Sequence, residues 1–217
     1  KQERSLELIY KLSKYTFFIM LIPAVPIMLS IDSMLELWLK EVPKYTVWFV
    51  ILRMISGLIS CLESGFDATI DATGNIRKTK TIFGLIFLST LPIVYILYRM
   101  KFPPYTLTLL LIFAEIIFIV VQTKILAALT EFNVSEYLSK SLLPVLLVVI
   151  LILPQFLLRF VFGEGILNLV GISLLSFFLT IATIYFVGLN REERIIIQTS
   201  IAKILYMKPF LTINKNI

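Results

Sequence analysis

Runs of about twenty apolar residues recur along this chain, and they limit most strongly what it can fold into. A helix of that length crosses the hydrocarbon core of a bilayer. Only helices and closed barrels satisfy all of their backbone polar groups there. Hydrophobic residues make up 59% of the sequence, against roughly 45–50% in an ordinary soluble domain. The sequence therefore predicts an all-α fold, a polytopic membrane helix bundle.

Six runs are long enough to span a membrane, and the connections between them are short. No stretch of soluble-domain composition interrupts them, so we expect residues 1–217 to form a single transmembrane bundle. The expected spans are Tyr15–Ile31, Thr46–Ala68, Thr81–Tyr98, Tyr105–Ala127, Ser141–Phe162 and Gly165–Val187.

A further helix is predicted after the sixth span, over residues 190–206. Asn190 precedes Glu193 by three residues, which is the spacing of a capping box. Ile197, Ile201 and Ile204 share one face of this helix. The pattern indicates an amphipathic helix that lies at the cytoplasmic interface of the membrane.

The basic residues are divided unevenly between the two ends of the predicted bundle. Fourteen lie on the side that holds both termini, five lie on the opposite side, and Arg53 lies within a span. By the positive-inside rule, both termini of this multi-pass protein are cytoplasmic. Arg77, Lys78 and Lys80 then form a basic cytoplasmic turn.

Several classes of function find no support in the composition. The chain has no histidine and only one cysteine, Cys61, so we expect no disulfide, metal site, cofactor or catalytic triad. The net charge of +6 is explained by topology and lipid headgroups and does not predict nucleic-acid binding. Asp67 and Asp71 have the spacing of metal-binding aspartates in membrane prenyltransferases, but the second aspartate cluster of such enzymes is missing.

A stripe of polar residues runs along the second predicted span. On a helical wheel, its members lie within roughly 60° of Arg53. Such a stripe cannot face lipid, so it either packs against another helix or lines a water-filled cavity. Close packing explains the small residues but not the charged ones, and we therefore expect a cavity. The members are Arg53, Ser56, Gly57, Ser60, Ser64, Asp67 and Asp71.

The fourth predicted span carries one acidic residue, Glu115. Gln122 lies seven residues further on, so the two share a face and are expected to line the same cavity. Counted from the outer ends of their spans, Arg53 and Glu115 lie at depths that agree to within roughly 5 Å. An Arg53–Glu115 ion pair is therefore possible, either as a structural contact or as part of a binding site.

Three stretches of the chain carry a resemblance to a known family. They are Leu35–Gly84, which contains "LWLKEVP" and "ATGNIRK", then Leu91–Thr106, and Tyr185–Arg194, which contains "GLNREE". Together they resemble the polysaccharide flippases of the multidrug/oligosaccharidyl-lipid/polysaccharide exporter superfamily. Lys40 stands where the first motif of that family usually has glycine, and Asn75 and Arg77 depart from the second motif.

The resemblance implies a function and a larger architecture. Members of the family have about twelve to fourteen spans in two related bundles, and this chain corresponds to the C-terminal half. The absence of an initiator methionine fits a piece of that kind, whose partner is the missing N-terminal half. The implied activity is translocation of a polyprenyl-diphosphate-linked oligosaccharide across the bacterial cytoplasmic membrane for surface polysaccharide biosynthesis, by alternating access. Arg53 is then expected to face the substrate anion.

Two alternatives stay open at the level of the sequence. One is a multidrug extruder of the same superfamily, whose binding site is expected to be more apolar or more acidic. The other is a membrane enzyme that acts on lipid-linked sugars. Such enzymes usually have a large outer loop, whereas no outer connection here exceeds about fifteen residues.

Overall fold

The computed structural model describes residues 2–158 and 166–206, and within these ranges every regular element is a helix. Five helices are long and apolar enough to cross a membrane, and a bent pair supplies a sixth span. The predicted all-α membrane bundle is thus confirmed. The elements are α1 (Gln2–Trp38), α2 (Thr46–Cys61), α3 (Phe66–Ala72), α4 (Ile76–Arg99), α5 (Thr106–Leu129), α6 (Val134–Tyr137), the π-helical η1 (Leu138–Leu142), α7 (Leu143–Ile152), the 3-10 helical η2 (Leu153–Leu157), α9 (Ile166–Thr183), the π-helical η3 (Ile184–Gly188) and α10 (Arg191–Tyr206).

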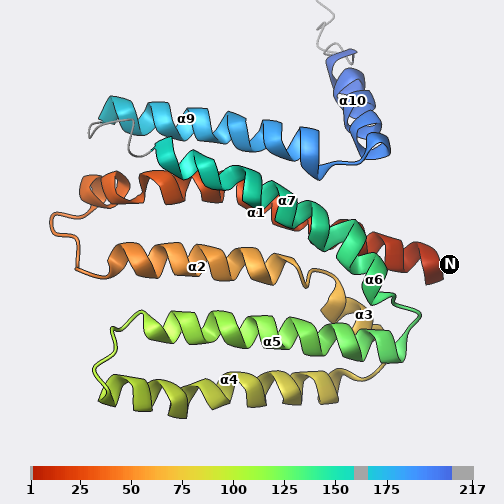
Figure 1. Ribbon diagram of the computed structural model, residues 1–217. Coiled ribbons are helices and arrows are strands. Elements are labelled where there is room, and N and C mark those ends of the chain that lie inside the picture. Colours follow the sequence, from red (N-terminus) through yellow and green to blue (C-terminus); the bar gives the residue numbers. More distant parts are fainter. Residues whose placement is uncertain (1, 159–165, 207–217) are drawn as a thin grey trace, which may run out of the picture.

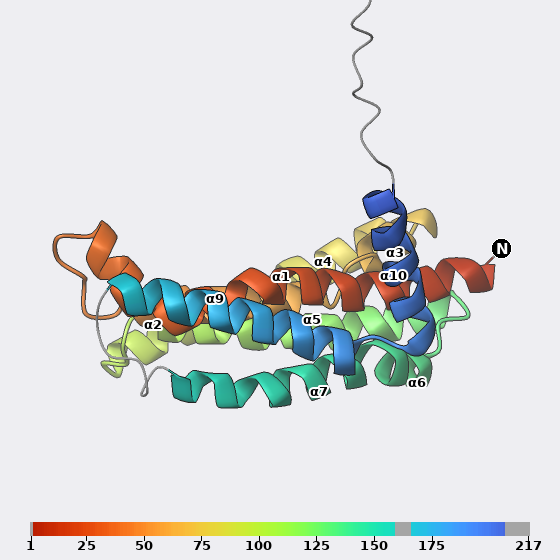
Figure 2. The same ribbon diagram turned by 90° about the horizontal axis from the view of Figure 1, so that it is seen from above.

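The long helices lie side by side (Figure 1). α1 packs between α2 and α9, and α5 packs between α2 and α4. α7 lies beside α1 and α9, to one side of this row (Figure 2). The start of α1 and helix α10 are found at the same end of the bundle, as an even number of crossings requires.

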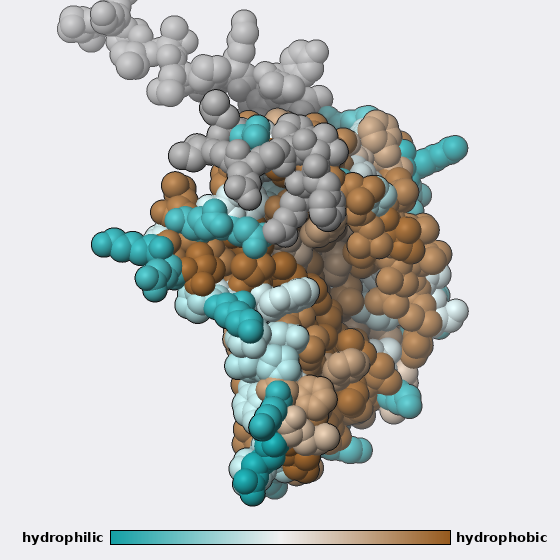
Figure 3. Space-filling view, turned by 60° about the vertical axis from the view of Figure 1, so that its left-hand side comes forward, coloured by the Kyte–Doolittle hydropathy of each residue, from teal (hydrophilic) through white to brown (hydrophobic). Residues whose placement is uncertain are grey.

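Much of the outer surface is apolar, as a bilayer-facing surface must be. Figure 3 shows brown apolar side chains over much of one face, with hydrophilic side chains gathered along its edges. Helix α4 is the most exposed span, with only 11% of its most apolar window buried inside the bundle. Leu85, Leu88 and Leu91 on this helix are each more than half exposed. Lipid, or another protein surface, must cover them.

Proline positions explain the irregular turns of the fifth span, which runs from α6 through η2. Pro144 has no N–H, and its ring clashes with the carbonyl one turn earlier. The backbone accommodates this with the wide π-helical turn η1, directly before Pro144. Pro154 coincides with the tighter turn η2. The predicted end of this span, Phe162, lies outside the described residues.

The second predicted span is not one continuous helix, although the helical-wheel analysis treated it as one. α2 ends at Cys61, and α3 begins after Gly65, with a bend of 42° between the two helices. Gly65 has φ = 88°, a left-handed conformation that residues with a Cβ rarely adopt. The prediction of a continuous helix over Thr46–Ala68 was therefore wrong at residues 62–65.

Hydroxyl groups from elsewhere in the chain satisfy the carbonyls freed by this break. Thr16 donates to the carbonyl oxygen of Cys61 at 3.0 Å, and Tyr137 donates to that of Leu62 at 2.8 Å. Ser13 donates to the carbonyl oxygen of Ser64 at 3.3 Å. Within a membrane, a broken helix is tolerated only where neighbouring groups supply such bonds.

An aromatic cluster fixes α3 against the start of α1 and the end of α5. Phe66 and Ile70 are fully buried there, together with Leu126. The ring of Phe66 meets those of Phe132 and Tyr137 edge-on, at centroid distances of 5.7 and 5.3 Å. The apolar side of α3 is therefore held in the core, which leaves its acidic residues on the opposite side.

Helix α10 turns away from the direction of the long helices (Figure 1). One of the two hydrogen bonds of the predicted capping box is present: the backbone N–H of Asn190 donates to Glu193 Oε2 at 2.8 Å. Ile197 is half-buried towards the bundle, whereas Ile195 and Ile196 are exposed. The side chains of Ile201 and Ile204 lie outside the described set. The predicted helix is confirmed, and its place at the interface stays a prediction.

Candidate functional site

An open groove of about 480 Å³ lies along α2, next to Met20 of α1. Four members of the predicted polar stripe line it: Arg53, Ser56, Gly57 and Ser60. Arg53 is exposed, whereas Ser56 is buried at the base of the polar face. The other lining residues are Met20, Phe49, Val50 and Met54.

Arg53 and Glu115 are linked through a serine. Arg53 Nη1 donates to Ser56 Oγ at 3.3 Å, and Ser56 Oγ donates to Glu115 Oε1 at 2.8 Å. The two charged groups are thus at matching depth, as expected, but the ion pairs of the described residues do not include them. The arginine remains largely free to meet another anion, because a single long hydrogen bond holds it.

Three of the other predicted residues, Asp67, Lys80 and Gln122, meet in a second polar region after the break in the helix. Asp67 accepts a hydrogen bond from Gln122 Nε2 at 2.8 Å and forms an ion pair with Lys80 at 2.7 Å. Lys80, predicted as part of the basic turn, is therefore also tied to the acidic side of α3. Asp71 is exposed, and so are Arg77 and Lys78.

The break divides what the wheel presented as one stripe. Ser64 Oγ accepts a hydrogen bond from Thr16 of α1 at 3.0 Å, so it faces a packed helix and not the groove. The lining of the groove likewise does not include Asp67, Asp71, Glu115 and Gln122. For Asp67 and Asp71 the cause is the turn at Gly65, which gives α3 a different direction from α2.

One acidic residue of this region was not predicted from the sequence. Glu63 lies in the turn between α2 and α3, near enough to Asp67 and Glu115 for their negative charges to repel one another. Its Oε2 atom is buried and has no hydrogen-bond partner. On an unbroken wheel Glu63 falls outside the polar stripe. In the sequence, only the Ser64-Gly65 pair indicates a turn here, and the turn is what directs the Glu63 side chain towards the polar region.

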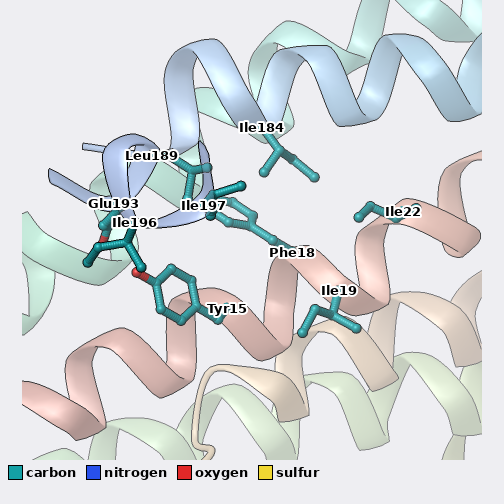
Figure 4. Close-up of a pocket in the computed structure, with 9 residues that line it drawn as sticks. All are labelled: Tyr15, Phe18, Ile19, Ile22, Ile184, Leu189, Glu193, Ile196 and Ile197. Atoms are coloured by element: carbon teal, nitrogen blue, oxygen red, sulfur yellow. The ribbon is translucent and has the colours of Figure 1, made fainter. Parts of the chain in front are cut away.

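A second cavity, of about 370 Å³, lies between α1, η3 and α10 (Figure 4). Its walls are almost entirely aliphatic and aromatic, and they include Phe18, Ile19 and Ile197. At one end, the Tyr15 hydroxyl points towards Glu193 (Figure 4). No sequence motif predicted this cavity.

A buried ion pair lies beside that cavity. Lys14 Nζ donates to both carboxylate oxygens of Glu193, at 2.6 and 2.7 Å, and the two residues are 1% and 6% exposed. Burial alone would raise the pKa of Glu193. The hydrogen bonds from Lys14 and from the Asn190 N–H outweigh it, so the pKa lies below its ordinary value. Lys14 was counted only as a topology signal in the sequence.

The acidic residues of the described chain do not form a recognisable metal centre. Within the described ranges, no three histidine, cysteine, aspartate or glutamate side chains are grouped so that they could hold a metal ion. No family model matches the chain, and no curated protein or solved structure matches it significantly.

Proposed function

We propose that this chain is half of a flippase that moves a polyprenyl-diphosphate-linked oligosaccharide across the bacterial cytoplasmic membrane. The observation that carries the proposal is the open groove on α2, where an exposed arginine lies on a membrane-spanning helix. The resemblance of three sequence stretches to polysaccharide flippases supports the same interpretation. Both termini are proposed to be cytoplasmic, as the distribution of basic residues indicates.

The chemistry of Arg53 suits a diphosphate. A guanidinium group stays charged at all physiological pH values and offers a planar fork of donors to phosphate oxygens. Ser56 and Ser60 add hydroxyl groups in the same groove, which suit the hydroxyls of a sugar. The apolar remainder of the lining suits the first part of a polyprenyl chain.

The position of the groove also supports the need for a partner. An arginine that faces lipid costs several kcal/mol, so charged residues in spans face water or protein. In the isolated bundle, the groove lies on the outside of α2. We propose that a second bundle, the N-terminal half of the transporter, faces this surface and closes the cavity. Residues 1–217 alone are therefore not expected to transport.

The test uses the complete transporter in vesicles, with flipping of a lipid-linked oligosaccharide as the readout. Arg53→Ala is expected to abolish flipping at near-normal expression. Arg53→Lys is expected to retain part of it, because lysine keeps the charge but loses the fork. Arg99→Ala, which removes an exposed arginine at the end of α4, is the matched control and should flip normally.

A double variant separates substrate binding from a structural role. Arg53→Leu combined with Glu115→Leu removes both charges, so it leaves no unpaired charge behind. If the double variant is stable and flips like the parent, Arg53 has only a structural role, and the proposal for this groove is wrong.

One observation favours the multidrug extruder as a second candidate. The negative charges of Asp67 and Glu115 both act on the Glu63 carboxylate, and an acidic region of this kind suits organic cations. Export of a lipophilic cation by the complete transporter, with no flipping of lipid-linked sugars, would favour that candidate.

A further inference from the structure

Three buried side-chain oxygens have no hydrogen-bond partner in the described part of the chain, and all three belong to α5 or to the turn that packs beside it. They are Glu63 Oε2, Glu115 Oε2 and Gln122 Oε1. Buried acceptors are nearly always paired, so unpaired ones require an explanation. All three are acceptors, which means that the missing group is a donor or a positive charge.

The charges in this region do not balance. Asp67 and Lys80 form a direct ion pair and compensate each other. Glu63 and Glu115 remain. Arg53 contacts Glu115 only through Ser56, and the cation near Glu63 is Lys80, which Asp67 already holds. One negative charge is thus left over at membrane depth, where an uncompensated charge is expensive.

Gln122 independently indicates that a hydrogen-bond donor or a positive charge is missing from this region. Its side chain is 1% exposed, and its amide nitrogen donates to Asp67. That bond fixes the plane of the amide, yet the amide oxygen on the same group has no donor. A neutral acceptor buried next to carboxylates is stabilised by a positively charged or protonated neighbour, and not by a further anion.

We propose that Glu63 is a proton-binding site, and that its carboxylic acid form supplies the missing donor in this interface. The step is the transfer of one proton from a hydronium ion to a Glu63 carboxylate oxygen, which leaves a water molecule and breaks no bond elsewhere in the chain. Glu63 is the carrier because Glu115 already accepts a hydrogen bond from Ser56. The site does not depend on which substrate the protein transports.

Ionisable groups around Glu63 come from α3, α4 and α5, and the phenol of Tyr137 comes from α6. Helix α1 also packs against the turn, through the hydroxyls of Ser13 and Thr16. The cation near the Glu63 carboxylate is Lys80, which is already paired with Asp67. The groups are Asp67, Lys80, Glu115 and Tyr137, with Arg53 beyond Glu115 and Asp71 beyond Lys80.

The test is carbodiimide labelling of the purified chain in lipid vesicles. Dicyclohexylcarbodiimide enters apolar regions and reacts with a protonated carboxyl. The acid proton passes to a carbodiimide nitrogen, and the carboxyl oxygen bonds to the central carbon. Mass spectrometry of the peptides is expected to find the adduct on Glu63 at neutral pH. Labelling should fall at least tenfold as the pH is raised, because the carboxylate form does not react.

Two controls lie within the same protein. Asp67, which is paired with Lys80, should stay unlabelled, and so should the exposed loop residue Glu41. Glu63→Gln is expected to abolish the adduct, while Glu41→Gln leaves it unchanged. The result with the unmodified sequence decides the matter even if Glu63→Gln fails to fold.

Two outcomes would overturn the proposal. One is the absence of an adduct on Glu63 in a folded preparation at neutral pH. The other is labelling that sodium ions suppress while a rise in pH does not, because the missing positive charge would then be a bound sodium ion and not a proton.

Discussion

Lys14 and Glu193 lie 179 positions apart in the sequence, yet the ammonium of one contacts both carboxylate oxygens of the other at 2.6 and 2.7 Å. The pair fastens α10 to α1 in a place that water does not reach, since both side chains are almost fully buried. It ties the helix that follows the last span to the first helix of the bundle.

Loss of one partner in this pair is expected to destabilise the protein strongly. Glu193→Leu or Lys14→Met leaves a buried charge without its counter-charge, which costs about 3–5 kcal/mol. The double variant leaves no charge and should recover most of that loss. Thermal unfolding of the purified protein in detergent measures the effect. A double variant no more stable than the single ones would show that packing, and not charge, governs this contact.

The same pair predicts how stability depends on pH. The pKa of Glu193 is lowered in the folded protein, so its contribution is fully present above the ordinary value of 4.5. That contribution is lost as the pH falls through the lower, folded value. We expect the unfolding temperature to decline below about pH 4.5, and to decline less in the Lys14→Met, Glu193→Leu double variant. An equal decline in both proteins would show that a group other than Glu193 causes the pH dependence.

Gly188 is expected to tolerate no larger residue. A Cβ there would lie 2.6 Å from Phe18 Cζ and 3.1 Å from Val148 Cγ2, both on well-buried side chains. Gly188→Ala should therefore cost about 1–3 kcal/mol. Gly84→Ala is the matched control, because a Cβ added there would meet no atom within 4 Å, and helix propensity favours the change. Phe18→Leu should relieve part of the cost at Gly188, and thermal unfolding in detergent compares the variants.

The orientation of the bundle predicts which cysteines an impermeant reagent reaches. In a Cys61→Ser background, Lys40→Cys lies after α1 and Lys78→Cys lies at the start of α4, and neither position is buried. A membrane-impermeant maleimide added to intact cells should label position 40 and leave position 78 unlabelled until the cells are opened. Labelling of position 78 from outside would reverse the proposed topology.

The spans could be predicted because their signal is local. Hydropathy over about twenty residues depends on no distant contact. The expected range Tyr105–Ala127 matches α5 (Thr106–Leu129) closely, whereas α4 begins at Ile76, before the expected Thr81. The cap of α10 could be predicted for the same reason, and the Asn190 N–H donates to Glu193 as that cap requires.

What the sequence did not reveal depends on distant partners. The break after Cys61 is stable because Thr16 and Tyr137 donate to its carbonyls, and neither residue is near it in the chain. Without the break, Glu63 falls on the wrong side of the wheel and Ser64 falls in the stripe. The buried ion pair of Lys14 could not be predicted either. A lysine near the end of a span ordinarily indicates only the orientation of the helix in the membrane.

The hydroxyl groups at the break have a consequence for the order of biosynthesis. Ser13 and Thr16 precede the break in the chain, so two of its carbonyls meet their donors as soon as α2 packs on α1. The donor for Leu62, Tyr137, is made 75 residues later. During synthesis from the N-terminus, the second span thus enters the bilayer with one carbonyl still unsatisfied. We expect it to stay near the insertion machinery, or near water, until the fifth span arrives.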